Sequence, residues 1–367
     1  MCGNIYVYSL RLDKGERVGT SLSETHVKIG IIAPIAWRTP PREYGPWEQV
    51  AHLHAEGLME AGEEVTLFAT ADSQSSGRLA AVCPRAYEED KSLDPKVWEC
   101  LHIAHAMERA GEFDILHNHF DFLPLSYSRL IDTPLVTTIH GFSSRRILPV
   151  YRAYDDRVYY VSISNADRAA GLSYAATIYH GLRLEQFPFS NSPEEYLAFF
   201  GRIHHDKGTR EAIEIAKRAG MRLRIAGIVQ DRDYHEREVL PHVDGKRITY
   251  EGVAGPNERR RLLGGALALL HPINFAEPFG LSVAEAMLCG TPVIAFARGS
   301  MPELIEHGRT GFLVTGVNEA VEAAGRLGEI RRRDCRDRAA ARFTVDRMVE
   351  EYRGLYRRIL AGELSPR

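Results

Sequence analysis

The stretch that decides how this chain folds is Asn274-Phe-Ala-Glu-Pro-Phe-Gly-Leu-Ser-Val-Ala-Glu-Ala-Met-Leu-Cys-Gly-Thr-Pro-Val-Ile-Ala295. It holds two carboxylates, Glu277 and Glu285, with a glycine turn at Gly280 and the start of a helix between them. Gly280 permits a tight turn with exposed backbone, and the first N–H groups of the helix behind it form a site for an anion. The stretch therefore predicts a place where hydroxyl groups and a phosphate are held together.

The sequence pattern supports a binding role more strongly for one of the two carboxylates than for the other. Ser282-x-x-Glu285 has the form of a capping box, so Glu285 can also be explained as a residue that only caps the helix. Glu277 precedes the helix beside Pro278, where a carboxylate contributes nothing to packing. Glu277 is therefore the stronger candidate for binding.

Apolar strands alternate with helices on both sides of this stretch. Val27–Pro34 has the continuous apolar character of a buried parallel strand, and Pro46 suits the first turn of the helix that follows. A second series starts at Tyr196–Gly201. The alternation predicts an α/β fold of two tandem Rossmann-like, doubly wound domains with a cleft between them. Further predicted strands are Val65–Ala69, Phe113–His119, Leu135–Gly141, Val158–Ser164, Arg222–Ile228, Ile248–Gly252, Leu267–Pro272 and Pro292–Phe296, and further predicted helices are Glu211–Ala219 and Pro256–Gly264.

The same patterns predict the domain boundaries. Residues 1–26 are polar and turn-rich and form an N-terminal extension. An N-terminal domain spans 27–190, Phe187–Pro193 is a linker, and a C-terminal domain spans 194–344. Apolar residues at helical spacing predict a last helix over about 345–362.

Composition excludes several classes of function. The 367 residues are 44% hydrophobic and 26% charged with a net charge of −3, so no basic footprint for nucleic acid exists. No run of about 18 apolar residues predicts a membrane helix. Five cysteines without a CxxC pair predict reduced thiols in a cytoplasmic protein. Residues 1–190 carry 18 Lys+Arg and 24 Asp+Glu, a net −6, which argues against docking on anionic lipid and favours a soluble partner.

A second chemical loop follows the strand Tyr196–Phe200. Gly201-Arg202 and Lys207-Gly208 place two cations around a turn. Arg202 can grip phosphate oxygens in a bidentate manner and Lys207 adds a point charge. Taken alone, this pattern is explained equally well if Arg202 and Lys207 are only solvent-exposed loop residues. The anion site predicted around Gly280, in the same domain, favours diphosphate binding.

Histidines end two strands of the N-terminal domain. His117 and His119 share one face of a strand, but His102 and His105 lie on a predicted helix and no carboxylate completes a metal site. The sequence therefore predicts no metal here. His119, at the strand's carboxyl end, is expected to face the cleft and contact substrate or handle a proton, and His140 is a similar, weaker case.

Asp231-x-Asp233 resembles an Asp-x-Asp metal motif, but capping of the helix that follows explains it adequately. His204-His205 is expected to be a solvent-facing turn.

Together these residues resemble the retaining, GT-B-fold glycosyltransferases of family 4, from Val27 to Leu360. Glu277 and Glu285 match that family's E-x7-E element with its Pro-Phe-Gly-Leu and Gly-Thr-Pro-Val-Ile. Arg202 and Lys207 match its Gly-Arg…Lys-Gly diphosphate clamp. The remaining matches are Gly311-Phe-Leu-Val, a late strand, and His119, the histidine near the transferred sugar.

The resemblance implies a role for each matched residue. Glu277 would bind hydroxyls of the donor sugar, Glu285 the ribose, and Arg202 with Lys207 the departing diphosphate, beside Gly201. Backbone amides at Phe279, Gly280 and Leu281 would contact the phosphate or sugar. Such catalysis is electrostatic: positive groups of the protein stabilise the leaving diphosphate, so no metal is needed. No cofactor is expected either, because the nucleotide-sugar is itself a substrate. The last helix would cross back to the N-terminal domain, and closure of the cleft would assemble the site.

One departure from the family concerns the loop after the first strand. Many relatives have a Gly-Gly pair there, whereas Gly45 is followed by Pro46, which has no N–H. The loop at Gly45 therefore lacks one backbone contact to the phosphate or acceptor, for which Gly45 and His140 are the candidate residues. The leading hypothesis is transfer of a hexose from a UDP- or GDP-sugar to a soluble small-molecule or glycan acceptor. A GT-B-fold sugar phosphorylase, a nucleotide-sugar epimerase and a non-catalytic binding module are the alternatives, and no oligomeric state is predicted.

Overall fold

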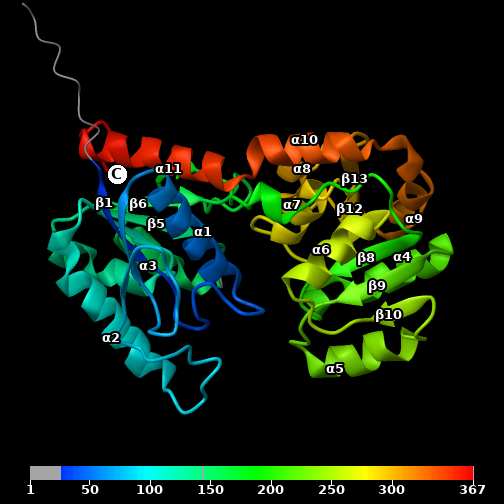
Figure 1. Cartoon of the computed structure of the whole chain (residues 1–367), viewed down its shortest axis with the longest axis horizontal. Helices are drawn as coiled ribbons and strands as arrows, with labels where there is room; N and C mark the ends of the chain where they lie inside the picture. Colours follow the sequence, from blue (N-terminus) through cyan, green and yellow to red (C-terminus); the bar gives the residue numbers. More distant parts are fainter. Residues whose placement is uncertain (1–25, 143, 367) are drawn as a thin grey trace, which may run out of the picture.

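The computed structural model describes residues 26–142 and 144–366. Its elements form two α/β lobes that lie side by side (Figure 1). The N-terminal lobe contains the first parallel sheet and the C-terminal lobe the second. All but the last residue of the predicted extension 1–26 lies outside the described residues.

The sheet of the N-terminal lobe has seven parallel strands in the order β3-β2-β1-β4-β5-β6-β7. The strand order reverses between β1 and β4, and ligands of doubly wound sheets bind beyond the carboxyl ends of strands at such a point. The short edge strands β3 and β7 are not among the predicted ones, because neither is fully buried. The strands are β1 Lys28–Ile32, β2 Glu64–Phe68, β3 Arg78–Ala80, β4 Ile115–Asn118, β5 Leu135–Ile139, β6 Val158–Ser162 and β7 Tyr174–Thr177.

The sheet of the C-terminal lobe has six parallel strands in the order β10-β9-β8-β11-β12-β13. Its order reverses between β8 and β11, so the loops that follow these two strands meet at one edge of the sheet. These are the two loops that carry the predicted site. The strands are β8 Tyr196–Phe200, β9 Arg222–Ala226, β10 Ile248–Tyr250, β11 Ala268–His271, β12 Val293–Phe296 and β13 Gly311–Val314.

Helices cover both sheets, and the predicted ones begin and end close to their predicted bounds. Pro46 opens α1 at its first turn, as expected. The helices are α1 Pro46–Glu60, α2 Pro95–Glu108, α3 Leu148–Ala153, α4 Thr209–Ala219, α5 Arg232–Tyr234, α6 Pro256–Gly265, α7 Leu281–Leu288, α8 Met301–Leu304, α9 Val317–Gly325, α10 Arg332–Arg342 and α11 Val345–Leu360.

The chain crosses between the lobes twice, and the two crossings lie side by side. The Leu182 N–H donates to the carbonyl of Phe343 (2.8 Å), and the Val345 N–H donates to the carbonyl of Leu182 (3.1 Å). After this crossing α11 runs along the N-terminal lobe while α10 covers the C-terminal lobe (Figure 1). A Cβ on Gly57 of α1 would lie 2.6 Å from a methyl of Val349, so this glycine lets α1 and α11 pack closely. The last helix therefore belongs to the core of the N-terminal lobe.

No helix within 26–142 and 144–366 is long and apolar enough to span a bilayer.

Candidate active site

The loop after β11 and the helix α7 place the two carboxylates of the opening stretch. Gly280 is the N-cap of α7 in the left-handed region (φ 93°), and a Cβ there would meet Met301 at 2.7 Å. Since α7 begins at Leu281 without a side-chain cap, Ser282 and Glu285 do not form a capping box. The explanation of Glu285 as a cap is therefore wrong. The N–H groups of Leu281 and Ser282 have no carbonyl within the helix to bond.

Glu277 is a buried carboxylate that contacts Lys207 and His271. The Lys207 ammonium donates to its Oε2 at 2.5 Å, and His271 Nε2 lies 3.4 Å from the same oxygen. Burial alone would raise the pKa of Glu277, but the Lys207 charge and His271 outweigh it and lower that pKa to about 2. Glu277 is therefore an anion at neutral pH, although only 9% of it is exposed.

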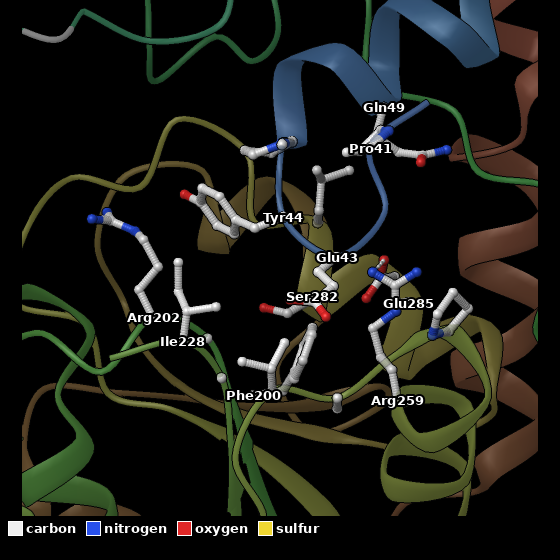
Figure 2. Close-up of a pocket in the computed structure, with 18 of the residues that line it drawn as sticks. Pro41, Glu43, Tyr44, Gln49, Phe200, Arg202, Ile228, Arg259, Ser282 and Glu285 are labelled. Atoms are coloured by element: carbon white, nitrogen blue, oxygen red, sulfur yellow. Dashed lines mark ion pairs between the residues drawn. The ribbon is translucent and has the colours of Figure 1, made fainter. Parts of the chain in front are cut away.

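Glu285 is deeper and less well partnered. It is 4% exposed, and its Oε1 lies 3.2 Å from a terminal nitrogen of Arg259 on α6. Its Oε2 and the Nε of Arg259 are both buried without a hydrogen-bond partner among the described residues. Burial raises the pKa of Glu285, and Arg259 opposes that rise. Figure 2 shows this pair at one side of a pocket. An orphaned buried acceptor in a pocket costs free energy unless a ligand supplies a donor.

The loop after β8 is locked against the loop after β11. A Cβ on Gly208 (φ 75°) would lie 2.0 Å from the carbonyl oxygen of Pro272, so only glycine fits there. The Asn274 N–H donates to the carbonyl of Asp206 at 2.6 Å. These contacts hold Lys207 beside Glu277, while Arg202 donates to the side chain of Gln230.

Two adjoining pockets between the lobes contain these groups. Glu285 and Arg259 line one pocket, which we call the ribose-side pocket after the role that the resemblance implies for Glu285. Glu277, Lys207 and His140 line the other, which we call the sugar-side pocket after the implied role of Glu277. Gly201, Arg202, Leu281 and Ser282 line both. A cation and the free amides of a helix N-terminus therefore lie where the two pockets join, with one carboxylate on each side. Phe279 and Gly280 line the sugar-side pocket only.

The N-terminal lobe contributes a residue that the sequence did not single out. Tyr44 lines both pockets, and its ring reaches over the C-terminal lobe near Arg202 (Figure 2). Burial raises the pKa of its hydroxyl, and the Arg202 charge opposes this. Gly45 (φ 145°) lines the ribose-side pocket. The loop before α1 therefore lies against the pocket residues of the C-terminal lobe near Arg202. Tyr44 belongs to no sequence motif that could have identified it.

The histidines are arranged differently from the prediction. His119 is fully buried and lines neither pocket, and its backbone N–H donates to the carbonyl of Ile32 at the end of β1. His140 lies between it and the cleft, with its ring stacked on Trp47 at 5.4 Å between centroids. The expectation that His119 faces the cleft is therefore wrong in position, and His140 is the imidazole at the wall.

Two groups of described side chains have the composition of a metal site. His54, His117 and His119 place ring nitrogens within 4.8 Å of one another, as do ligand atoms of His204, His205 and Asp206. Both nitrogens of His117 are already hydrogen-bonded, to Tyr356 and Thr138. The second group lies on an exposed turn. Asp231 caps α5 by accepting from the Tyr234 N–H, as expected. The expectation of metal-independent chemistry stays a prediction.

Comparisons with known proteins match both lobes. Residues 183–339 match the family model "Glycosyl transferases group 1" and residues 47–182 match "Glycosyltransferase Family 4". Glycogen synthase of Mycobacterium tuberculosis is 25% identical over 91% of this chain and 96% of its own.

Solved structures share the fold. A sucrose-phosphate synthase of Thermosynechococcus elongatus is similar with a TM-score of 0.74 at 20% identity, over 92% of this chain and all of that one. Anabaena HepE in complex with UDP-glucose has a TM-score of 0.68 at 19% identity, over 92% of this chain and 100% of that one. With two Rossmann-like lobes and matches that together span 47–339, the chain belongs to the group 1 glycosyltransferases.

Proposed function

We propose that this glycosyltransferase moves a hexosyl group from a UDP- or GDP-sugar to a soluble acceptor, with retention of anomeric configuration and without a metal. The observation that carries the proposal is the junction of the two pockets. Arg202 and the amides of Leu281 and Ser282 lie between Glu277 and Glu285, an order that complements the sugar hydroxyls, the anionic diphosphate and the ribose hydroxyls of a nucleotide diphosphate-sugar.

Each part of the donor has a complementary group. Glu285 Oε2 is a buried acceptor with no partner and suits a ribose hydroxyl. The positive end of α7, with Arg202, suits the diphosphate. Glu277 is anionic and suits hydroxyls of the sugar. The UDP-glucose bound to HepE, a protein of the same fold, supports a donor of this class.

The residues would act by stabilising the charge that develops as the sugar–phosphate bond breaks. Arg202, Lys207 and the α7 amides are fixed before the reaction, so they need little reorganisation to receive the leaving diphosphate. Lys207 lies 2.5 Å from Glu277 and can serve both sugar and phosphate. In a front-face reaction the leaving phosphate takes the acceptor proton, and the acceptor enters past Trp47 and His140.

Binding of the donor is the first test. A ligand that binds the folded state raises its melting temperature. We expect UDP-glucose or a GDP-hexose to raise that temperature, and Glu285→Gln to reduce the rise, measured from the melting temperature of the unliganded variant. If no UDP- or GDP-sugar stabilises the wild type, the assignment of the pockets is wrong.

Product analysis separates the alternative enzymes. A transferase with the bound donor releases free nucleotide, slowly to water and faster with an acceptor. A phosphorylase would release sugar 1-phosphate from a glycoside and inorganic phosphate, and an epimerase would release neither. We expect free nucleotide, with no sugar 1-phosphate.

A further inference from the structure

A chain of hydrogen-bonded imidazoles runs from the cleft into the core of the N-terminal lobe. His180 and His140 line the sugar-side pocket, with 3.3 Å between Nε2 of His180 and Nδ1 of His140. His140 Nε2 lies 2.8 Å from His119 Nδ1, and His119 Nε2 lies 3.0 Å from His54 Nδ1. His54 Nε2 lies 3.2 Å from the hydroxyl of Tyr356 on α11. These four histidines and Tyr356 are called the imidazole chain below.

The chain continues to a second tyrosine of α11. The Tyr356 hydroxyl lies 2.5 Å from Nδ1 of His117, whose Nε2 lies 2.8 Å from the Thr138 hydroxyl. That hydroxyl lies 2.6 Å from the hydroxyl of Tyr352. The far end of the network is therefore two turns of α11 that are buried against the sheet.

The rings of the imidazole chain are uncharged. Burial lowers the pKa of His54 and of His180 to about 3, and it holds the pKa of His119 and His140 well below the usual range. A neutral imidazole has one nitrogen that donates and one that accepts. Since both nitrogens of His140, His119 and His54 are bonded along the chain, the tautomer of each ring sets that of the next.

The hydrogen bonds of the network can all donate toward α11 or all donate toward the cleft. The last member of the network, the Tyr352 hydroxyl, decides between these two directions. If the protons point toward α11, the Thr138 hydroxyl donates to Tyr352, and the buried Tyr352 O–H has no acceptor among the described residues. If they point toward the cleft, Tyr352 donates to Thr138 and every donor in the core is used. An unsatisfied buried O–H is costly, so the second direction is favoured. His140 then carries its proton on Nδ1 and accepts from His119 at Nε2.

We infer that His119, His54 and Tyr356 are positioning residues, which hold the ring of His140 in one orientation and one neutral tautomer at the sugar-side pocket. Stacking of that ring on Trp47 fixes its plane, and the bonds to His119 and His180 fix its rotation. The inference deepens the proposed function and rests on it. A glycosyl group gains positive character as its bond to the leaving group breaks, so an uncharged wall avoids repelling it.

The experiment removes one hydroxyl far from the cleft and reads the tautomer of His140. Tyr356→Phe keeps the packing of α11 but leaves His54 Nε2 without a partner, so neither direction of the chain satisfies it. In protein with ¹⁵N-labelled histidine and no ligand, we expect the His140 nitrogens to change from one tautomer to a mixture. Turnover of UDP-glucose, or of whichever donor binds, should fall about tenfold in kcat with little change in KM, as for a misplaced group.

A matched control and a second variant keep the result interpretable. Tyr160→Phe removes an equally buried hydroxyl, which bonds the carbonyl of Tyr151 outside the chain, and should change neither readout. His54→Phe keeps a ring but cuts the chain between His119 and Tyr356, and should match or exceed Tyr356→Phe. If both variants fold and the His140 signals stay those of the wild type, the inference is overturned. Failure of the proposed function is distinguishable, because it would show as absent donor binding in the wild type.

Discussion

The two walls of the cleft are built in different ways. On the C-terminal lobe, Lys207 and Glu277 stand in two short loops that are held against each other by backbone, as at Gly208, where a Cβ would meet the carbonyl oxygen of Pro272. On the N-terminal lobe, His140 is held by side chains from four separate segments, ending at Tyr356 on α11. A loop that requires glycine at a fixed position can be recognised as a motif in the sequence. A network of side chains that are far apart in the sequence cannot. The difference also predicts where single substitutions do most damage.

The largest effect is expected on the C-terminal wall, at Lys207. Lys207→Ala removes the cation that we propose to contact the sugar and the leaving diphosphate, and it leaves the buried Glu277 carboxylate without its lysine partner. We expect kcat to fall roughly 100- to 1000-fold, as when one preorganised charge-stabilising group is lost. Release of nucleotide from the bound donor measures it.

The matched control for Lys207 is Lys246→Ala, an exposed lysine of the same lobe that should leave turnover unchanged. Near-normal rates in Lys207→Ala would mean that the diphosphate does not lie where the two pockets join.

The next effect is expected at the ribose-side pocket. Glu285→Gln exchanges one acceptor oxygen for a donor nitrogen, so the ribose hydroxyl that we propose to bind there would lose its acceptor. Loss of such a hydrogen bond weakens binding by about 1.5–3 kcal/mol, or at least roughly tenfold in Kd. Titration calorimetry with UDP and GDP measures the loss and shows which nucleotide the pocket prefers. Equal affinity of wild type and variant for both nucleotides would contradict the assignment of Glu285.

How far the sequence predicts the molecule follows the same division. The two doubly wound sheets were predicted correctly because buried parallel strands are continuous apolar runs, as at Val293–Phe296. Glu277 and Lys207 were predicted to act together, and they are in contact because the strand order reverses between β8 and β11, whose following loops carry them. Arg259 was missed because it is one arginine among several on an ordinary amphipathic helix. The sequence does not predict which of His119 and His140 reaches the cleft, because this depends on how far the ends of β4 and β5 project from the sheet.

A smaller effect concerns acid stability. The folded-state pKa of Glu277 is depressed to about 2, so its contribution to stability is fully present above the unfolded-state value and is lost as pH falls from about 4.5 toward 2. Glu277→Gln removes this dependence. We expect the melting temperatures of wild type and variant to converge as pH is lowered from 5 to 3. A gap between them that stays constant or widens over this range would show that Lys207 does not stabilise the Glu277 carboxylate.

The smallest effect is expected where the two lobes touch beside the cleft. Glu303 on α8 accepts from the N–H groups of Asn165 (3.0 Å) and Ala166 (2.8 Å) and from the Tyr179 hydroxyl (2.8 Å). Both N–H groups and the hydroxyl belong to the N-terminal lobe, so this one carboxylate ties the walls together.

Glu303→Ala should loosen this contact between the lobes, although Glu303 itself lines neither pocket. Water can replace partly exposed bonds of this kind, so the loss is about 1 kcal/mol, and we expect KM for the donor to rise at most roughly fivefold with kcat little changed. Glu322→Ala, at an exposed glutamate of the same lobe, is the matched control. If Glu303→Ala instead lowers kcat as far as Lys207→Ala does, then closure of the lobes, rather than charge at the junction, limits the reaction. The C-terminal wall would in that case depend on the N-terminal one for its catalytic geometry.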